Sequence, residues 1–459
     1  MEAIPADAAD AALRDASESL QGRLLVGTIN SIGVRRDADA ADALATRLRD
    51  PDAEVASAAA VALGRIGSNV AATSLRAALT TVPENVRSAV AEGCVLCAER
   101  FHAQGESATA IEIYDEVRAA DVPVQRIVEA TRGAILAREE NGLPLLLDTL
   151  RSPEIKLQQI ALATAREFPG DQVDTALANE LDQASPRLAA LIIQAMADRA
   201  DTVVLDAVLQ AAGQGPAEVR RSAIEALRRI GNESCLSQLL AVAAEDNVEL
   251  KQAAEETLAV LPGANVDAQI VAMLPVTKGK DYVLLLQLIA KRRIDAVEEV
   301  VKALDHSDLT IRSAALVALG QTVSLDRLAL LVSAVIDSKN SDDTDVAKQA
   351  LRTASVRMPD REACAAVLTK ALPLASGTTK TTLLEILTEV GGGTALNTIH
   401  AAAISSDPQL QDDGSRLLGK WNGVEAAPKL LHLAANAPAD KYKLRALRGY
   451  IGVARKFPM

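Results

Sequence analysis

Residues 50–67 read DPDAEVASAAAVALGRIG, and this stretch decides the fold. Its first three residues are typical of a turn that caps a helix start, and its last residue, Gly67, is typical of a helix end. Between them the apolar residues recur at the i, i+3, i+4 and i+7 spacing of one helix face. The stretch therefore predicts one capped helix with one apolar face.

The same pattern recurs along the chain, most clearly at 215–231 and 307–320. If Val55 is taken as a register mark, its equivalents follow one another at steps close to 31 residues. These marks are Leu24, Val55, Val86, Ile127, Leu157, Leu188, Val219, Leu250, Val283, Ile311, Val346, Thr379, Leu410 and Leu444. A second helix, such as 40–49, lies between successive marks, which gives about fourteen helical hairpins. A hairpin of this length cannot cover its own apolar faces, so we expect neighbouring hairpins to stack.

Composition and charge exclude several classes of protein. The chain is 49% hydrophobic but only 2% aromatic, which favours close packing of helix on helix. A net charge of -13 argues against a nucleic-acid partner, because such binding requires an excess of Lys and Arg. The sequence shows no secretory signal, and its longest strongly apolar run, 282–290, is too short to span a membrane. For these two reasons the cytoplasm is the default expectation, and four scattered cysteines indicate a reduced compartment.

The repeated pattern, DPxxxVxxxAxxALGxIG, resembles the HEAT repeat, in particular the bacterial type called PBS-lyase HEAT-like. The resemblance implies an all-α fold over residues 1–459, a single continuous right-handed α-α superhelix of the armadillo-like class. It also implies protein binding along the concave surface. Some proteins with such repeats attach bilin chromophores, and others are modules of larger bacterial proteins with sugar-active domains.

Two places depart from the regular repeat. The step from Val86 to Ile127 is 41 residues, which predicts an insertion or an irregular repeat at 99–123. The last helix keeps apolar residues up to the end of the sequence, with no polar cap after it. We therefore expect that the chain is cut from a longer protein, or that its C-terminus docks on another domain or partner. A third segment, 337–345, is acidic but lacks the spacing that wraps calcium, so it predicts a solvated loop.

No residue set predicts catalysis, a cofactor or a metal. Residues 414–420 match the spacing of a phosphate-binding loop up to its lysine, but Trp421 stands where a hydroxyl residue must bind magnesium. Cys94 and Cys97 lack a second pair of ligands and predict buried structural cysteines. The four histidines, at 102, 306, 400 and 432, are isolated in sequence.

Basic residues give the only candidate site. The position after the register mark is basic in six repeats, at Arg87, Arg220, Lys251, Arg312, Lys380 and Arg445. One interpretation is a ladder of ion pairs with acidic residues of nearby turns, namely Asp52, Glu84, Glu218, Glu249 and Asp308. The other is a basic stripe on the inner surface for an acidic protein partner, formed by Arg220, Arg221, Arg228, Arg229, Lys251, Arg292, Arg293 and Arg312.

These observations favour a non-catalytic protein-binding scaffold. The first alternative is an accessory repeat domain of a larger bacterial enzyme, for example a sugar-active one, whose catalytic domain lies outside this chain. A bilin-lyase-like enzyme is the second alternative, and the scarcity of aromatic and histidine residues argues against it.

Overall fold

The computed structural model describes residues 7–337 and 340–457. Within these ranges the chain forms 28 α-helices and no strand, and the helices pair into fourteen hairpins. The predicted fold class and the number of hairpins are confirmed. The chain forms two compact units, Met1–Ile230 and Gly231–Met459.

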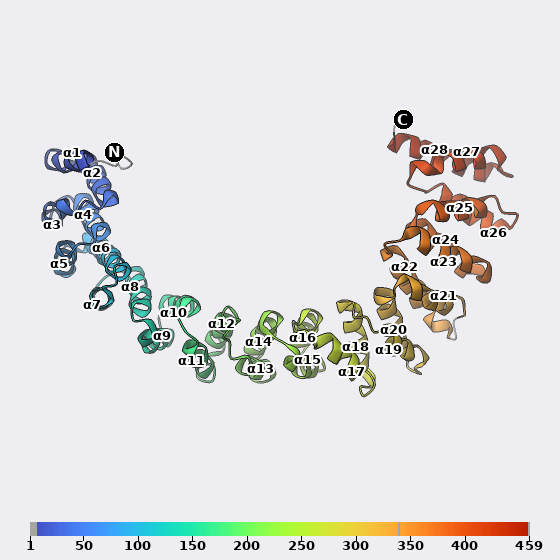
Figure 1. The fold of residues 1–459 in the computed structure, drawn as a ribbon, viewed down its shortest axis with the longest axis horizontal. Coiled ribbons are helices and arrows are strands. Elements are labelled where there is room, and N and C mark those ends of the chain that lie inside the picture. The colour runs from blue at the N-terminus through green and yellow to red at the C-terminus, as the bar shows by residue number, and fades with distance from the viewer. Residues whose placement is uncertain (1–6, 338–339, 458–459) are drawn as a thin grey trace. The chain divides into compact units, whose positions relative to one another are not determined.

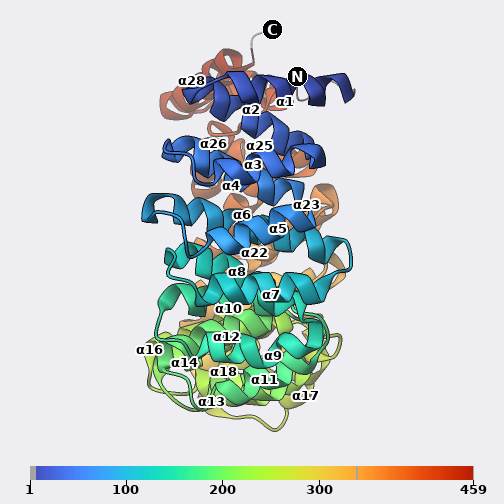
Figure 2. The same ribbon diagram turned by 90° about the vertical axis from the view of Figure 1, so that its left-hand side faces the viewer.

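Unit 1 is a stack of seven hairpins (Figures 1 and 2). Its helices are α1 (Asp7–Ser19), α2 (Gly22–Arg35), α3 (Ala41–Arg47), α4 (Ala53–Ile66), α5 (Asn69–Ala78), α6 (Glu84–Ala103), α7 (Ser107–Ala119), α8 (Val124–Ala137), α9 (Leu143–Leu150), α10 (Ile155–Glu167), α11 (Gln172–Glu180), α12 (Pro186–Ala197), α13 (Leu205–Gly213) and α14 (Ala217–Ile230). The even-numbered helices form one layer, here called the even layer, and the odd-numbered helices form the other. The unit is curved, and its even layer lies on the inner side of the curve (Figure 1).

Unit 2 repeats this two-layer arrangement with seven more hairpins. Its helices are α15 (Leu236–Ala243), α16 (Val248–Val260), α17 (Val266–Met273), α18 (Gly279–Arg292), α19 (Val297–Lys302), α20 (Leu309–Thr322), α21 (Leu328–Ile336), α22 (Thr344–Arg357), α23 (Arg361–Ala371), α24 (Gly377–Val390), α25 (Gly392–Ala403), α26 (Pro408–Leu418), α27 (Ala427–Asn436) and α28 (Asp440–Lys456). Short 3-10 turns lie between several of these helices, among them η4 (Ala303–Asp305) and η6 (Ser341–Asp343).

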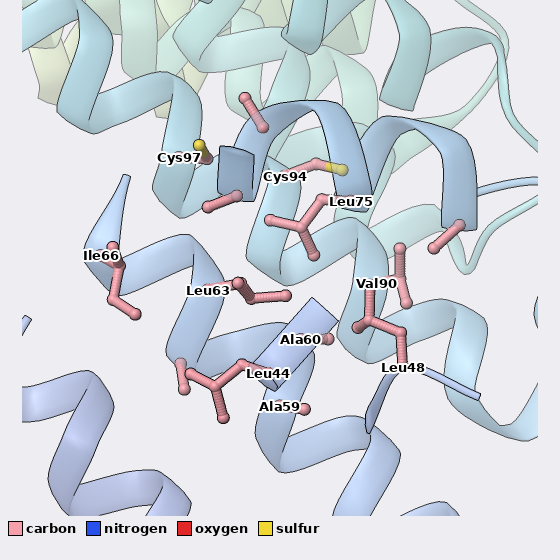
Figure 3. Close-up of a cluster of buried hydrophobic side chains, with 14 of the residues drawn as sticks. Leu44, Leu48, Ala59, Ala60, Leu63, Ile66, Leu75, Val90, Cys94 and Cys97 are labelled. Carbon is pink, nitrogen blue, oxygen red and sulfur yellow. The ribbon is translucent and has the colours of Figure 1, made fainter. Parts of the chain in front are cut away.

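Residues 50–67 form the second helix of the second hairpin, as the pattern predicts. The Asp52 carboxylate accepts a hydrogen bond from the Glu54 backbone N–H at 2.9 Å and so begins α4. Gly67 ends it in the left-handed region, with φ 64°. The apolar face of α4 packs with α3, α5 and α6 into a continuous core, where Leu63 lies among Leu44 and Leu75 (Figure 3).

Glycine allows neighbouring even-numbered helices to cross at close range. A Cβ added to Gly64 of α4 would lie 2.4 Å from the Gly93 carbonyl oxygen of α6. A Cβ added to Gly33 of α2 would lie 2.7 Å from the Cα of Ala62. The first glycine of the repeated motif, at the position of Gly64, therefore sets the spacing between these hairpins.

Two of the predicted register marks are exposed. Leu24 is 68% exposed, whereas the next residue, Leu25, is only 3% exposed and belongs to the core of unit 1. Leu444 is 53% exposed, while Tyr442 is only 5% exposed. Tyr442 precedes Gly449 by 449 − 442 = 7 residues, as Val86 precedes Gly93, and a Cβ on Gly449 would lie 2.9 Å from Gly419. In α28 the core position is therefore filled by Tyr442 rather than by Leu444.

The long step between Val86 and Ile127 is taken up mainly by helix. The α6 helix has 20 residues and continues to Ala103, and α7 begins four residues later, at Ser107. Phe101 and Tyr114, from α6 and α7, are buried in the core of unit 1. In the acidic segment 337–345, the prediction for residues 338–339 falls outside the described residues, and η6 follows them. No helix in the described part of the chain is both long and apolar enough to cross a membrane.

Candidate protein-binding surface

Ion pairs connect successive helices of the even layer in unit 1. Arg132 of α8 binds Glu167 of α10 through two hydrogen bonds, with Nε–Oε1 and Nη2–Oε2 distances of 2.9 and 2.6 Å. One step along the layer, Asp198 follows the end of α12 and binds both Arg166 of α10 and Arg229 of α14. These five side chains lie along four neighbouring helices, α8, α10, α12 and α14.

Asp198 is the centre of this arrangement. Its Oδ2 lies 2.5 Å from Arg166 Nε, and its Oδ1 lies 2.6 Å from Arg229 Nη2. An acidic group at the C-terminal end of a helix is disfavoured by the helix dipole, so the two guanidinium groups explain why a carboxylate is stable there. The hydrogen bond from Arg166, followed by that from Arg229, holds the pKa of Asp198 below its ordinary value, although partial burial opposes the shift. The carboxylate is therefore ionised at neutral pH, and the group of three carries one net positive charge.

A shallow depression of about 330 Å³ lies at the same place, between α10, α12 and α14. The three charged residues of the Asp198 group line it, together with Gln194 and Glu225. Ser222 lies at its base, where its hydroxyl donates a 3.0 Å hydrogen bond to the Ala190 carbonyl and ties α14 to α12. The depression thus offers amide, carboxylate and guanidinium groups on a rigid helical base.

The eight predicted partner-binding residues are distributed over both units. Arg220, Arg221, Arg228 and Arg229 belong to α14 of unit 1, and Lys251, Arg292, Arg293 and Arg312 belong to unit 2. Within α14, the side chains of Arg221, Arg228 and Arg229 are exposed, and Arg221 forms an ion pair with Glu225 four residues later. Arg220 is half-buried and donates from Nε to the Ala212 carbonyl at 3.1 Å.

In unit 2, two of these residues are held inside the fold. Arg312 is 6% exposed and donates to Asp343 at 2.7 Å and to the His306 and Ser307 carbonyls, each at 2.9 Å. Arg292 pairs with Asp267 at 2.6 Å and also donates to two backbone carbonyls. Lys251 and Arg293 are exposed.

The ion pairs predicted for the basic column form with different partners. Asp308 is one of the five acidic residues named as suitable partners, but its carboxylate caps α20 by accepting from the Thr310 N–H at 2.8 Å. Arg312 instead binds Asp343 in the next hairpin. Arg87 likewise binds Asp121, at 2.7 Å. An aspartate that caps its own helix does not also form the ion pair with a neighbouring hairpin, so different residues serve these two purposes.

The sequence analysis did not predict two side-chain pairs that the structure contains. Arg199 and Asp174 form a buried bidentate ion pair between α11 and the end of α12, at 2.8 and 3.1 Å. His400 of α25 and His432 of α27 lie side by side, with Nε2 and Nδ1 3.2 Å apart, so these two histidines are not isolated. Each imidazole pair or ion pair joins neighbouring hairpins or helices, and the spacing 432 − 400 = 32 equals about one repeat. That periodicity was the available signal for the histidine pair, whereas Arg199 and Asp174 are 199 − 174 = 25 residues apart and do not follow the repeat period.

The other candidate motifs fall inside regular helices. Cys94 and Cys97 are buried within α6, as predicted. Gly414 lies inside α26, where a Cβ would collide with the backbone of Ala403 of α25 at 2.3 Å, so the segment 414–420 is no phosphate-binding loop. Among the residues that the structure describes, no cluster of three or more His, Cys, Asp or Glu side chains is arranged to hold a metal ion.

Comparison with known proteins identifies the class. The family of HEAT repeats matches residues 8–93 and 173–259. These two segments are therefore HEAT repeats, and the remaining described hairpins have the same two-helix form. No match is found among curated proteins.

Solved structures of other solenoids are similar at low identity. A crystal structure of importin beta in a polyethylene glycol condition is 12% identical, with 98% of this chain and 75% of that chain covered and a TM-score of 0.41. The structure of yeast importin-beta (Kap95p) is 12% identical, with 97% and 77% covered and a TM-score of 0.39. A structure from work on a phosphorylation switch that controls the interaction between cadherin and beta-catenin is 14% identical. It covers 98% of this chain and 91% of that chain, with a TM-score of 0.32. At these values the likeness says nothing about function.

Proposed function

We propose that this chain is a non-catalytic protein-binding scaffold and that the even layer of unit 1 contacts an acidic segment of a protein partner. The observation that supports this proposal most directly is the Asp198 group. Two arginines share a single carboxylate on an exposed, curved surface, which leaves one positive charge for a partner to neutralise. Arg221 and Arg228 add exposed guanidinium groups on the same helix as Arg229.

The physical basis of such binding is the geometry of arginine. A guanidinium group donates several hydrogen bonds in one plane and can bind a carboxylate in a bidentate manner. The Asp198 carboxylate fixes the two arginines in place, so a partner does not have to order them on binding, which lowers the entropic cost. The same layer continues over successive hairpins, and many small contacts can therefore add to a few arginine anchors.

The proposal is tested by affinity capture with the immobilised chain from a lysate of its source organism, followed by cross-linking of any captured protein. We expect a cross-linked peptide to map to α12 or α14, and Arg228→Glu/Arg229→Glu to weaken capture by at least about tenfold. The matched control is Arg151→Glu. Arg151 follows α9 in the odd-numbered layer and is also an exposed arginine with an acidic partner, Glu180.

Circular dichroism must first show that the variants keep the helical content of the parent chain. Equal loss of capture in the α14 and Arg151 variants would count against the even layer as the contact surface. Unchanged capture in both would contradict the assignment to α14, and enrichment of nothing above a blank resin would contradict the scaffold itself.

A further inference from the structure

Two histidines face each other between successive odd-numbered helices of unit 2. The Nε2 atom of His400, on α25, lies 3.2 Å from the Nδ1 atom of His432, on α27. The ring planes are inclined by 68°, and their centroids are 5.1 Å apart. His432 is exposed and His400 is half-buried, so the pair lies at the surface. The two nitrogens are therefore close together at a place that a dissolved ion can reach.

The separation of these nitrogens fits chelation of one metal ion. Zinc binds imidazole nitrogen at about 2.0–2.1 Å, and two such ligands at an angle of about 90–109° lie about 2.9–3.4 Å apart. The observed distance of 3.2 Å falls within this range. No movement of the backbone is needed to bring both nitrogens to one ion, since rotation of the two rings can aim both lone pairs at it.

Metal binding requires that both facing nitrogens are unprotonated. In the hydrogen-bonded pair, one of them carries the shared proton. Each neutral imidazole has a second nitrogen, and transfer of that proton through solvent to the distal nitrogen of the same ring frees both lone pairs without a change in total charge. Burial, followed by the nearby Lys429 and His432, lowers the pKa of His400, which keeps this ring neutral at neutral pH.

The type of ligand selects the class of ion. Imidazole nitrogen suits Zn²⁺, Ni²⁺ and Cu²⁺, whereas Mg²⁺ and Ca²⁺ prefer oxygen ligands. In the described part of the chain, no third His, Cys, Asp or Glu joins the pair in a metal-binding group, so water has to fill the other coordination positions. Lys429 lies three residues before His432 and opposes a positive ion near His400. Two nitrogens beside a lysine predict a site of modest affinity.

We propose that His400 and His432 together bind a divalent transition-metal ion of the nickel, copper and zinc group, and that this ion ties α25 to α27. Both ligands are in place only when the two hairpins are stacked. The ion therefore binds the folded state and stabilises the contact between the hairpins. This inference goes beyond the scaffold function and does not depend on it, because the proposed protein-binding surface lies in unit 1.

The test is isothermal titration calorimetry on the full chain, without a histidine tag and freed of metal with EDTA, in a neutral buffer. We expect one ion per chain, tighter binding of Cu²⁺ than of Zn²⁺, and no binding of Mg²⁺. His400→Gln and His432→Gln should each weaken binding at least about tenfold, because each removes one of the two ligands. His102→Gln is the matched control, since His102 is an exposed histidine of unit 1 beside Ser107. This control should bind as the parent chain does.

Two further measurements separate a metal site from a hydrogen bond that is only structural. Electron paramagnetic resonance of the Cu²⁺ form should show coupling to two imidazole nitrogens in the parent chain and to one in His432→Gln. Lys429→Gln should strengthen Zn²⁺ binding by roughly two- to fivefold, because it removes a positive charge near His400. Saturating Zn²⁺ should also slow hydrogen exchange in α25 and α27 of the parent chain.

The proposal would be overturned if the parent chain bound neither Zn²⁺ nor Cu²⁺, or if the double variant His400→Gln/His432→Gln bound them as tightly as the parent chain. Exchange in α25 and α27 that does not respond to saturating Zn²⁺ would contradict the link between the two hairpins. Circular dichroism must show that the variants keep the parent's helical content. If a variant does not, the spectrum of the parent chain decides, because coupling to fewer than two nitrogens would exclude the pair as ligands.

Discussion

Gly64 of α4 and Gly93 of α6 lie directly against each other where their helices cross, and a Cβ on Gly64 would come within 2.4 Å of the Gly93 carbonyl oxygen. Glycine inside a helix costs about 1 kcal/mol relative to alanine. This cost is offset because the crossing brings the apolar faces of two hairpins into contact. Gly64, the first glycine of the repeated motif, is thus explained by the neighbouring hairpin rather than by its own helix.

We therefore expect Gly64→Ala to destabilise the contact between α4 and α6 by about 1–3 kcal/mol, because the added methyl group must push the two backbones apart. Gly452→Ala is the matched control, since Gly452 also lies inside a helix but has nothing within 4 Å of an added Cβ. It should be neutral or stabilising by up to about 1 kcal/mol. Hydrogen exchange measured helix by helix would report both effects, and equal protection of the two variants would contradict this role of Gly64.

The buried pair of Arg199 and Asp174 gives a second prediction. Asp174 is 1% exposed, and Arg199 binds it while also donating to the Phe168 carbonyl at 2.9 Å. Arg199→Met leaves the carboxylate buried without its partner, which should cost about 3–5 kcal/mol and expose α11 and α12 to exchange. Urea unfolding followed by hydrogen exchange measures this loss.

The control for that measurement is Arg221→Met. Its ion pair with Glu225 is exposed and lies within one helix, so its loss should cost no more than about 0.5 kcal/mol. If the Arg199 and Arg221 variants proved equally stable, the pair in the core would have no special structural role.

Most of the fold could be predicted from the repeat period, because one motif at steps near 31 residues specifies both the helix hairpin and its stacking. Local sequence patterns did not identify the ion-pair partner where an aspartate can either cap its own helix or bind an arginine. Asp308 and Arg312 are near in sequence, yet Asp308 caps its own helix and Arg312 binds Asp343, which lies 343 − 312 = 31 residues away. Partners one repeat apart in the sequence are neighbours in space, and a short stretch of sequence does not show this.

The apolar pattern also failed at the ends of the array. Leu24 and Leu444 fit the spacing but are exposed, and the nearby residues Leu25 and Tyr442 are buried instead, since spacing alone does not say which residue of a helical turn faces the neighbouring helix.

The histidine pair predicts a pH dependence for the contact between α25 and α27. Burial, together with the nearby Lys429 and His432, lowers the pKa of His400 from its ordinary value of 6.5. A lowered histidine pKa means that the folded state binds the proton less readily than the unfolded chain. The stability that comes from neutral His400 is thus complete above pH 6.5 and is lost as the pH falls through the folded-state pKa.

We expect α25 and α27 to lose protection from hydrogen exchange on acidification from about pH 7 to about pH 5, after correction for the intrinsic exchange rate. His400→Gln should flatten that dependence. His102→Gln, which alters a histidine beside Ser107 in unit 1, should leave it unchanged. The same pH dependence in all three proteins would show that His400 is not responsible.

The cysteines give a prediction about reactivity. Cys94, Cys97, Cys235 and Cys364 are all buried. Burial raises the pKa of Cys97 to about 12 and raises that of Cys94 still further from its ordinary value, so neither forms the reactive thiolate at neutral pH. An aromatic disulfide reagent should therefore label the native chain very slowly and label it fully in denaturant. Thr73→Cys, on an exposed face of α5, should add a single fast-reacting thiol to the native protein. Fast labelling of the parent chain would contradict the burial of these cysteines and reopen Cys94 and Cys97 as a functional pair.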